Sequence, residues 1–131
     1  MTDTDGLRQF DGEHYLSLTT YRRDGTPVST PVWFVADAGR LFVYTADGTG
    51  KVKRIRHTAG VRVEPCDRRG RVHGQARGAT ARLLPEERDV SRIERLMTGK
   101  YGRLFRLFRG ARSLRRRLGR GEPRIGIELT V

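Results

Sequence analysis

Residues 14–45, HYLSLTTYRRDGTPVSTPVWFVADAGRLFVYT, carry the pattern that decides the fold. Two turn sequences divide this stretch, RRDG at 22–25 and DAGR at 37–40, and the Asp-Gly pair in the first favours a tight hairpin. Before the first turn, apolar and polar side chains alternate, which is typical of a half-buried strand. Between the turns, the run VWFV indicates a strand that is buried on both faces. The sequence therefore predicts strands over 14–20, 26–36 and 41–45, joined as an antiparallel meander.

The remaining sequence adds three strands and two helices to this meander. In chain order it predicts a short helix that begins near Thr49, a strand over 61–66, a long strand over 71–84, a long helix that begins near Pro85 and a terminal strand over 125–131. Gly74 and Gly78 interrupt the long strand and permit the bending that a closed barrel requires. We expect a single domain over residues 1–131, mainly β: a six-stranded antiparallel split barrel of the FMN-binding type, with a short helix after the third strand and a longer basic helix before the last.

Length and composition limit the class of protein. With 131 residues, of which 36% are hydrophobic, the chain fits one domain with a small core. No stretch approaches the roughly 18 apolar residues of a membrane span, and the polar residues 1–13 are unlike a signal peptide, so we expect a cytoplasmic protein. The single cysteine, Cys66, excludes an intrachain disulfide. One thiol with scattered histidines has no metal-ligand spacing, and no metal site is expected.

The positive charge is concentrated in one segment. The formal net charge is +12, and the segment 92–120 holds eleven basic residues and one acidic residue. Its apolar positions recur at intervals of three and four, including Ile93, Met97, Tyr101 and Leu104, which predicts an amphipathic helix with glycines that could break it. Such a helix could bind anionic lipid or nucleic-acid phosphate. We favour the alternative that its apolar side packs on the barrel, and we do not expect nucleic acid as the partner.

The sequence GTGK, which ends at Lys51, is the strongest candidate for a binding site. It is not a P-loop, because Thr45 stands where the first glycine is needed and Val52 where a magnesium-binding hydroxyl is needed. A nucleotide triphosphatase is therefore rejected. Backbone amides at a helix start, together with Lys51, Lys53 and Arg54, still suit an anion such as phosphate. A solvated basic helix face is the alternative.

Other reactive residue types have no partners at a diagnostic spacing. His14, His57 and His73 lack a neighbouring nucleophile or acid, so each is interpreted as an ordinary structural residue. Cys66 precedes two arginines that could activate it, but a structural thiol is the preferred interpretation. Trp33 lies in a predicted buried strand and is either a core residue or a wall for a planar ring.

The order of several motifs resembles a known family. LSLTTYRRDGTPVSTPVWFV, GRLFVYT, TGKVKRIRHTAGVRVEPCDRRG and KYG at 100–102 are similar to the split-barrel proteins related to pyridoxamine 5'-phosphate oxidase. They resemble most the B group of flavin/deazaflavin oxidoreductases of actinobacteria, in the subgroup of deazaflavin (F420)-dependent enzymes. The resemblance covers about residues 14–131.

The resemblance implies a homodimer whose interface groove holds a flavin or deazaflavin. By position, Pro31, Val32 and Trp33 are expected to border the ring system. Thr45 is expected near the phosphate, which Lys51, Lys53 and Arg54 would hold, and Thr49 is the hydroxylated residue two positions before the binding lysine. Gly50 stands where related flavin oxidases have an arginine, which favours coenzyme F420 over FMN.

The resemblance also implies a function. The leading hypothesis is an F420-dependent reductase that transfers a hydride to a small activated organic acceptor. Because the coenzyme carries the chemistry, no catalytic residue is assigned, although Tyr44, His73 or solvent could supply a proton. One alternative is a non-catalytic protein that binds F420, FMN or heme. Another is a nucleic-acid or membrane-surface protein that acts through segment 92–120.

Overall fold

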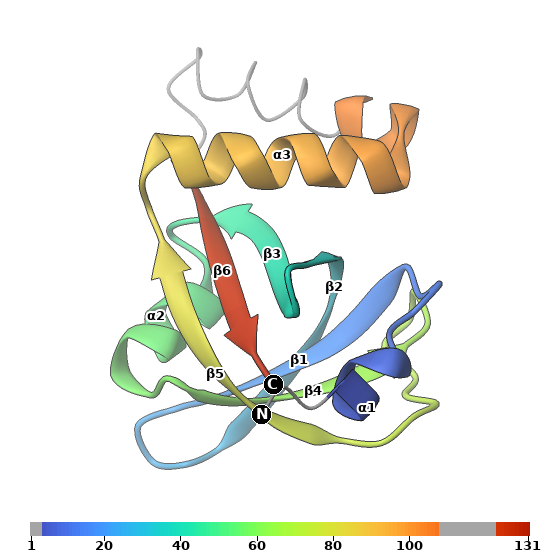
Figure 1. The fold of residues 1–131 in the computed structure, drawn as a ribbon. Helices are drawn as coiled ribbons and strands as arrows, with labels where there is room; N and C mark the ends of the chain where they lie inside the picture. The colour runs from blue at the N-terminus through green and yellow to red at the C-terminus, as the bar shows by residue number, and fades with distance from the viewer. Residues whose placement is uncertain (1–3, 108–122) are drawn as a thin grey trace.

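The computed structural model describes residues 4–107 and 123–131. Its elements are α1 (Thr4–Arg8), β1 (Tyr15–Tyr21), β2 (Pro27–Asp37), β3 (Arg40–Ala46), α2 (Gly50–His57), β4 (Gly60–Cys66), β5 (Arg77–Leu84), α3 (Glu87–Tyr101) and β6 (Arg124–Thr130). The six strands form a closed antiparallel barrel in the order β1-β2-β3-β6-β5-β4, with β4 pairing back to β1 (Figure 1). The predicted fold class, a mainly β six-stranded barrel with a helix after β3 and another before β6, is confirmed.

The barrel interior follows from the alternation of side chains along the strands. Leu16 and Leu18 of β1 are fully buried in a cluster that fills the barrel. The inward-facing side chains of β6 join the same cluster, as the period of two predicts: Ile125, Ile127 and Leu129. Val52 and Ile55, three positions apart on α2, are buried against it as well. Burial of these side chains fixes where α2 begins relative to the barrel.

A second apolar cluster lies between α3 and the outside of the barrel. Val90, Ile93 and Met97 recur at three and four along α3 and are buried. They pack against outward-facing side chains of the strands, among them Phe42 and Tyr44 of β3. Helix α3 consequently runs across one end of the barrel, where it contacts β2, β3 and β6 (Figure 1).

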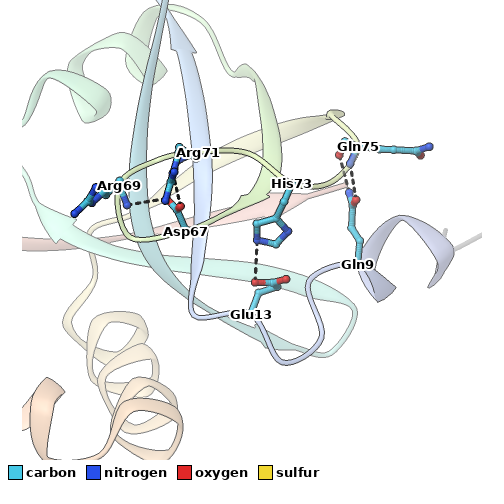
Figure 2. Close-up of polar contacts among 7 residues, drawn as sticks. All are labelled: Gln9, Glu13, Asp67, Arg69, Arg71, His73 and Gln75. Carbon is cyan, nitrogen blue, oxygen red and sulfur yellow. Dashed lines mark hydrogen bonds and ion pairs between the residues drawn. The ribbon is translucent and has the colours of Figure 1, made fainter.

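The predicted long strand over 71–84 is wrong in its first half, because β5 begins only at Arg77. The residues before it form a loop that polar contacts hold to α1 and the segment after it (Figure 2). The Gln9 amide pairs with both backbone groups of Gln75, at 2.7 and 2.9 Å, and His73 Nε2 lies 3.4 Å from Glu13 Oε2. These contacts replace strand pairing for most of the loop.

Gly74 is explained by a close approach and not by a bend within a strand. A Cβ atom at Gly74 would lie 2.3 Å from the Pro65 side chain, so only glycine lets the loop pass β4 this closely. At Gly78, which does lie in β5, a Cβ would meet nothing within 4 Å. The expected role of the two glycines in bending one long strand is therefore not borne out at Gly74.

The predicted basic helix does not continue unbroken along segment 92–120. Helix α3 ends at Tyr101, and Gly102 takes a positive φ of 63°, which favours glycine. Beyond this break Phe105 is buried, whereas Leu104 and Leu107 are 57% and 72% exposed, so the predicted apolar side at Leu104 does not pack on the barrel. The rest of the basic segment, from residue 108 onward, lies outside the described residues. Of the helices in the described part, none has the length and apolar character needed to span a bilayer.

Candidate functional site

A cavity of about 240 Å³ opens between β2, β3, α2 and α3. Five residues that the sequence predicted for the cofactor line it: Pro31, Val32, Trp33, Thr45 and Lys51. Four others complete the lining: Tyr15, Tyr44, Met97 and Phe105. Apolar and aromatic side chains therefore make most of the wall, and Lys51 brings a positive charge to it, which is the usual composition of a site for a small planar ligand.

The cavity lies where β2 changes its pairing partner. From Pro27 to Trp33 this strand pairs with β1, and from Phe34 to Asp37 it pairs with β3. The first part alternates between exposed and half-buried positions, and Phe34 is buried. The change of partner splits the sheet between β1 and β3, and the side chains of Pro31, Val32 and Trp33 border the opening.

Lys100 and Tyr101, at the end of α3, bond to the backbone of Phe34, where β2 changes its pairing partner. The Tyr101 hydroxyl accepts a hydrogen bond from Phe34 N at 3.0 Å, and its own proton is shared between Phe34 O at 2.8 Å and His14 O at 2.7 Å. Lys100 Nζ donates to Phe34 O at 2.9 Å and lies 3.6 Å from the centre of the Phe34 ring. Burial lowers the pKa of Lys100 to about 8 and raises that of Tyr101 to about 12. We call Lys100 and Tyr101 the α3 clamp.

The clamp also sets the aromatic wall of the cavity. The Tyr101 ring stacks on Trp33, with centroids 4.7 Å apart and planes at 12°. Phe105 lies 6.4 Å from Trp33 and 5.4 Å from Tyr44. We call Trp33 and Phe105, which line the cavity, together with the Tyr101 ring that stacks behind Trp33 outside the lining, the aromatic wall. Tyr101 covers one face of the indole, so the rest of Trp33 is what a ligand in the cavity can contact.

The start of α2 supplies the basic side of the site. Thr49 stands at the N-cap position, but its hydroxyl donates to Ala46 O at 3.0 Å and makes no capping bond to the helix amides. Lys51 lines the cavity. Thr49 and Lys53 are absent from its lining, and Lys53 is exposed.

Arg54 also lies outside the lining but beside the helix start. Its Nε donates to Thr20 Oγ1 at 2.6 Å, and a Cβ atom at Gly50 would lie 2.6 Å from Arg54 Nη1. Because Gly50 has no side chain, the Arg54 guanidinium can occupy the space beside it. The positive charge of Arg54 therefore lies next to position 50. Partial burial and the nearby Arg22 lower the pKa of Arg54. We call Lys51 and Arg54 the basic rim.

A buried polar group adjoins the cavity on the side of α3. The Tyr44 hydroxyl donates to Glu94 Oε2 at 3.1 Å, and Arg124 Nη1 donates to the same oxygen at 3.2 Å. Burial and the Glu94 charge raise the pKa of Tyr44 to about 12. Glu94, Met97 and Phe105 were not predicted as site residues. Met97 and Phe105 could have been found from the sequence, because Met97, Tyr101 and Phe105 recur every four residues.

The other candidate reactive residues stand away from the cavity lining. Cys66 is buried, and its burial raises the pKa of the thiol to about 11, which confirms the interpretation as a structural residue. His73 contacts Glu13, and His57 Nε2 lies 3.1 Å from an Arg23 guanidinium nitrogen. Across residues 4–107 and 123–131, no three His, Cys, Asp or Glu side chains gather as a metal site.

The sequence matches one family model. The model described as Pyridoxamine 5'-phosphate oxidase aligns with residues 4–124 of the chain. No curated protein has a significant match.

Several solved structures share the fold at low sequence identity. A conserved hypothetical protein from Mycobacterium tuberculosis is 16% identical, with a TM-score of 0.68, and the match covers 98% of this chain and 79% of that one. The heme storage protein from Vibrio cholerae is 13% identical, with a TM-score of 0.67 and coverage of 98% and 89%. A FAD-binding protein from Mesorhizobium loti is 14% identical, with a TM-score of 0.65 and coverage of 100% and 90%.

Proposed function

Because the chain belongs to the pyridoxamine 5'-phosphate oxidase family, we propose that it is a reductase dependent on the deazaflavin coenzyme F420. It transfers a hydride to a small activated organic acceptor. The observation that carries the proposal is the cavity whose lining combines the aromatic side chains of Trp33 and Phe105 with Lys51. A planar ring with an anionic tail is the ligand class that these two sides accept together.

The size of the cavity supports a ring system as its occupant. At about 240 Å³ it is smaller than the roughly 300–1,000 Å³ that encloses a drug-sized ligand. The tricyclic ring of a deazaflavin or flavin would therefore lie in the cavity, and the phosphate and the rest of the coenzyme would extend along α2. Lys51 and the Arg54 guanidinium beside Gly50 stand on that path.

The basic rim bears on the choice between F420 and FMN. The rim places two positive charges, Lys51 and Arg54, near the helix start, and these suit either the single charge of a phosphodiester or the doubly charged phosphate of FMN. The Arg54 guanidinium beside Gly50 therefore weakens the preference for F420 that the glycine alone implied. Lys53 and Thr49, which lie outside the lining, remain predicted ligands for parts of the coenzyme beyond the cavity. FMN stays the alternative cofactor.

A homodimer would complete the site. The part of β2 from Pro27 to Trp33 pairs with β1 along one edge, while its pairing to β3 starts only at Phe34, so the other edge is available for a second chain. This part contributes Pro31, Val32 and Trp33 to the cavity. A partner chain seated here would cover the open side of the coenzyme, as the family resemblance implies.

The protein's own residues bind the coenzyme, orient its ring and shield the ring from water. When bound, the coenzyme supplies the hydride chemistry. Trp33, held by Tyr101, fixes the plane of the ring, and the apolar lining keeps water from it. Lys51 holds the negative charge at the mouth of the cavity.

Heme binding is the second candidate, because the heme storage protein from Vibrio cholerae shares this fold. Heme iron is held by His, Cys, Met or Tyr ligands. Of the described residues that line the cavity, none is His or Cys, Met97 is fully buried, and the Tyr44 hydroxyl donates to Glu94, which leaves Tyr15 as the candidate iron ligand. These observations favour the flavin class.

The test separates a reductase from a carrier. The purified protein is given the reduced coenzyme and a panel of conjugated enones and quinones, and reoxidation is followed against a protein-free control. A reductase reoxidises the coenzyme faster than the control with at least one acceptor. A carrier binds the oxidised coenzyme in equilibrium dialysis without such acceleration, and hemin binding in place of coenzyme binding would support the second candidate.

The alternative that segment 92–120 binds nucleic acid or an anionic membrane needs its own test. A nucleic-acid or anionic-membrane function would give affinity for DNA or anionic vesicles that falls steeply with salt. It would also be insensitive to Lys51→Ala.

A further inference from the structure

A buried polar group links the coenzyme cavity with a second cavity. Tyr44 lines the first cavity, and Glu94 and Arg124 line the second, a polar cavity of about 190 Å³ between α3 and the start of β6. The three side chains are joined by hydrogen bonds at Glu94 Oε2, of 3.1 Å from Tyr44 and 3.2 Å from Arg124. They form a continuous polar connection through the apolar cluster under α3.

This connection is costly as a purely structural element. The Glu94 and Arg124 side chains are 10% and 17% exposed, and Tyr44 is buried between Phe105 and the Arg124 guanidinium. A buried ion pair usually stabilises a protein no better than apolar side chains of similar size, because both charges lose their hydration. The surrounding side chains are apolar, among them Ile93 and Met97. A function in the cavity that Tyr44 lines would explain why the polar residues are there.

We propose that Tyr44 donates the proton that the reduced acceptor needs, and that Glu94, positioned by Arg124, replaces that proton from water in the second cavity. The inference rests on the proposed function, since it concerns the acceptor of the hydride. Tyr44 is then a catalytic residue, and Glu94 and Arg124 are positioning and relay residues.

The step balances in atoms and electrons. The acceptor gains a hydride, with its electron pair, from the reduced deazaflavin, and a proton from the Tyr44 hydroxyl, so that two new bonds to hydrogen form. The O–H bond of Tyr44 breaks, and its oxygen regains a proton that passes from water through the Glu94 carboxylate. A bound reduced coenzyme would supply the hydride with its electron pair, and its remaining proton would pass to solvent. Neither Tyr44 nor Glu94 changes over a complete turnover.

The geometry gives each group one task. A tyrosine hydroxyl has one proton, which Glu94 accepts here, and two acceptor positions. To donate to a ligand, the O–H turns toward the cavity while Glu94, protonated from the second cavity, donates to the Tyr44 oxygen in its place. The Arg124 guanidinium satisfies the same carboxylate oxygen and keeps it facing Tyr44. Removing the hydroxyl alone, as in Tyr44→Phe, therefore interrupts the path and leaves the ring packing in place.

The experiment compares Tyr44→Phe and Glu94→Gln with Tyr21→Phe, a tyrosine at the end of β1 that does not line either cavity. Reoxidation of the reduced coenzyme by 2-cyclohexen-1-one and menadione is measured in single turnover, in water and in deuterium oxide. We expect Tyr44→Phe to slow the reaction at least about 100-fold, as loss of a general acid does. Glu94→Gln should slow it and change the solvent isotope effect. Tyr21→Phe should match the wild type.

A second readout does not depend on turnover. In protein with 13C-labelled tyrosine, the resonance lost in Tyr44→Phe identifies Tyr44, and we expect the oxidised coenzyme to shift it. Its pKa, about 12 in the wild type, should fall in Glu94→Gln because the carboxylate charge is one cause of the raised value. Equal rates and isotope effects in the wild type and Tyr44→Phe would overturn the inference while the reductase stands. Absence of coenzyme binding and turnover in the wild type itself would overturn the proposed function and this inference with it.

Discussion

The two sides of the cavity are built in different ways. The aromatic wall is fixed by contacts across the fold, since Tyr101 stacks on Trp33 and bonds to Phe34 and His14. The basic rim is built within one turn of α2 and its approach, where Lys51 lines the cavity and Arg54 fills the space beside Gly50. The wall is thus organised before a ligand arrives, and the rim supplies charge for the ligand to neutralise. Changes to the wall should cost stability, and changes to the rim should cost binding.

Breaking the wall should have the largest effect. Tyr101→Ala removes a half-buried ring stacked on Trp33 together with the hydroxyl that bridges β1 and β2, and we expect a loss of about 3–5 kcal/mol in the free energy of unfolding. Urea denaturation measures it. Leu104→Ala is the matched control, because Leu104 is 57% exposed and its loss should stay within about 0.5 kcal/mol. Equal losses in both variants would contradict the structural role of the clamp.

Changing the rim should separate binding from stability. Lys51→Ala should weaken coenzyme binding about 10- to 100-fold, the range for one charge-assisted hydrogen bond, with little change in the midpoint of unfolding. Isothermal titration calorimetry gives the affinity. Lys53→Ala is the matched control on the same helix, and because Lys53 is exposed outside the lining, we expect a change of about twofold or less. A larger effect at Lys53 than at Lys51 would relocate the anion site.

Removing only the Tyr101 hydroxyl should sharpen the comparison within the wall. Tyr101→Phe keeps the stack on Trp33 and leaves Phe34 N without its hydrogen-bond acceptor, which costs about 1–3 kcal/mol. Unfolding measured by circular dichroism reports the loss, while coenzyme affinity should change little. A variant as stable as the wild type would show that another group satisfies Phe34 N.

The smallest expected effect is a pH dependence of the clamp. Burial lowers the pKa of Lys100 to about 8, below its unfolded value near 10.4, so the folded state holds this proton less tightly than the unfolded chain. Stability is therefore reduced below pH 8 and rises as the pH passes from about 8 to about 10.5, by roughly 0.5–1 kcal/mol after solvent screening is allowed for. Urea unfolding at each pH tests this. Lys100→Met should lack the rise, and a rise that persists there would belong to another group.

The sequence predicted the strands of the barrel and the position of Lys51 at the cavity, but it grouped Lys51 with Lys53 and Arg54, which lie outside the lining. Alternation through residues 14–45 and 125–131 predicted strands that the structure contains, because a period of two places one face of each strand in the core. Lys51 could be found because a helix start and its charged residues are local in sequence. Local patterns of this kind need no knowledge of which segments meet.

The aromatic wall depends on contacts that no local pattern encodes. Tyr101 reaches Phe34 across 67 residues, and Glu94 reaches Tyr44 across 50. The strand predicted from residue 71 was too long for a related reason: Gln9 and Glu13, in the segment after α1, contact Gln75 and His73 (Figure 2). Pro65 also comes too close for any residue but glycine at position 74. Tertiary contacts outweighed strand propensity there.

The most direct test of the central claim uses Trp33, the single tryptophan of the chain. Its emission is followed while oxidised F420, FMN or hemin is added to the wild type and to Lys51→Ala. If the aromatic wall and the basic rim bind one coenzyme between them, F420 should quench Trp33 saturably, and Lys51→Ala should shift the midpoint about 10- to 100-fold upward. Quenching by none of the three ligands, or F420 quenching that is unchanged in Lys51→Ala, would contradict a shared site.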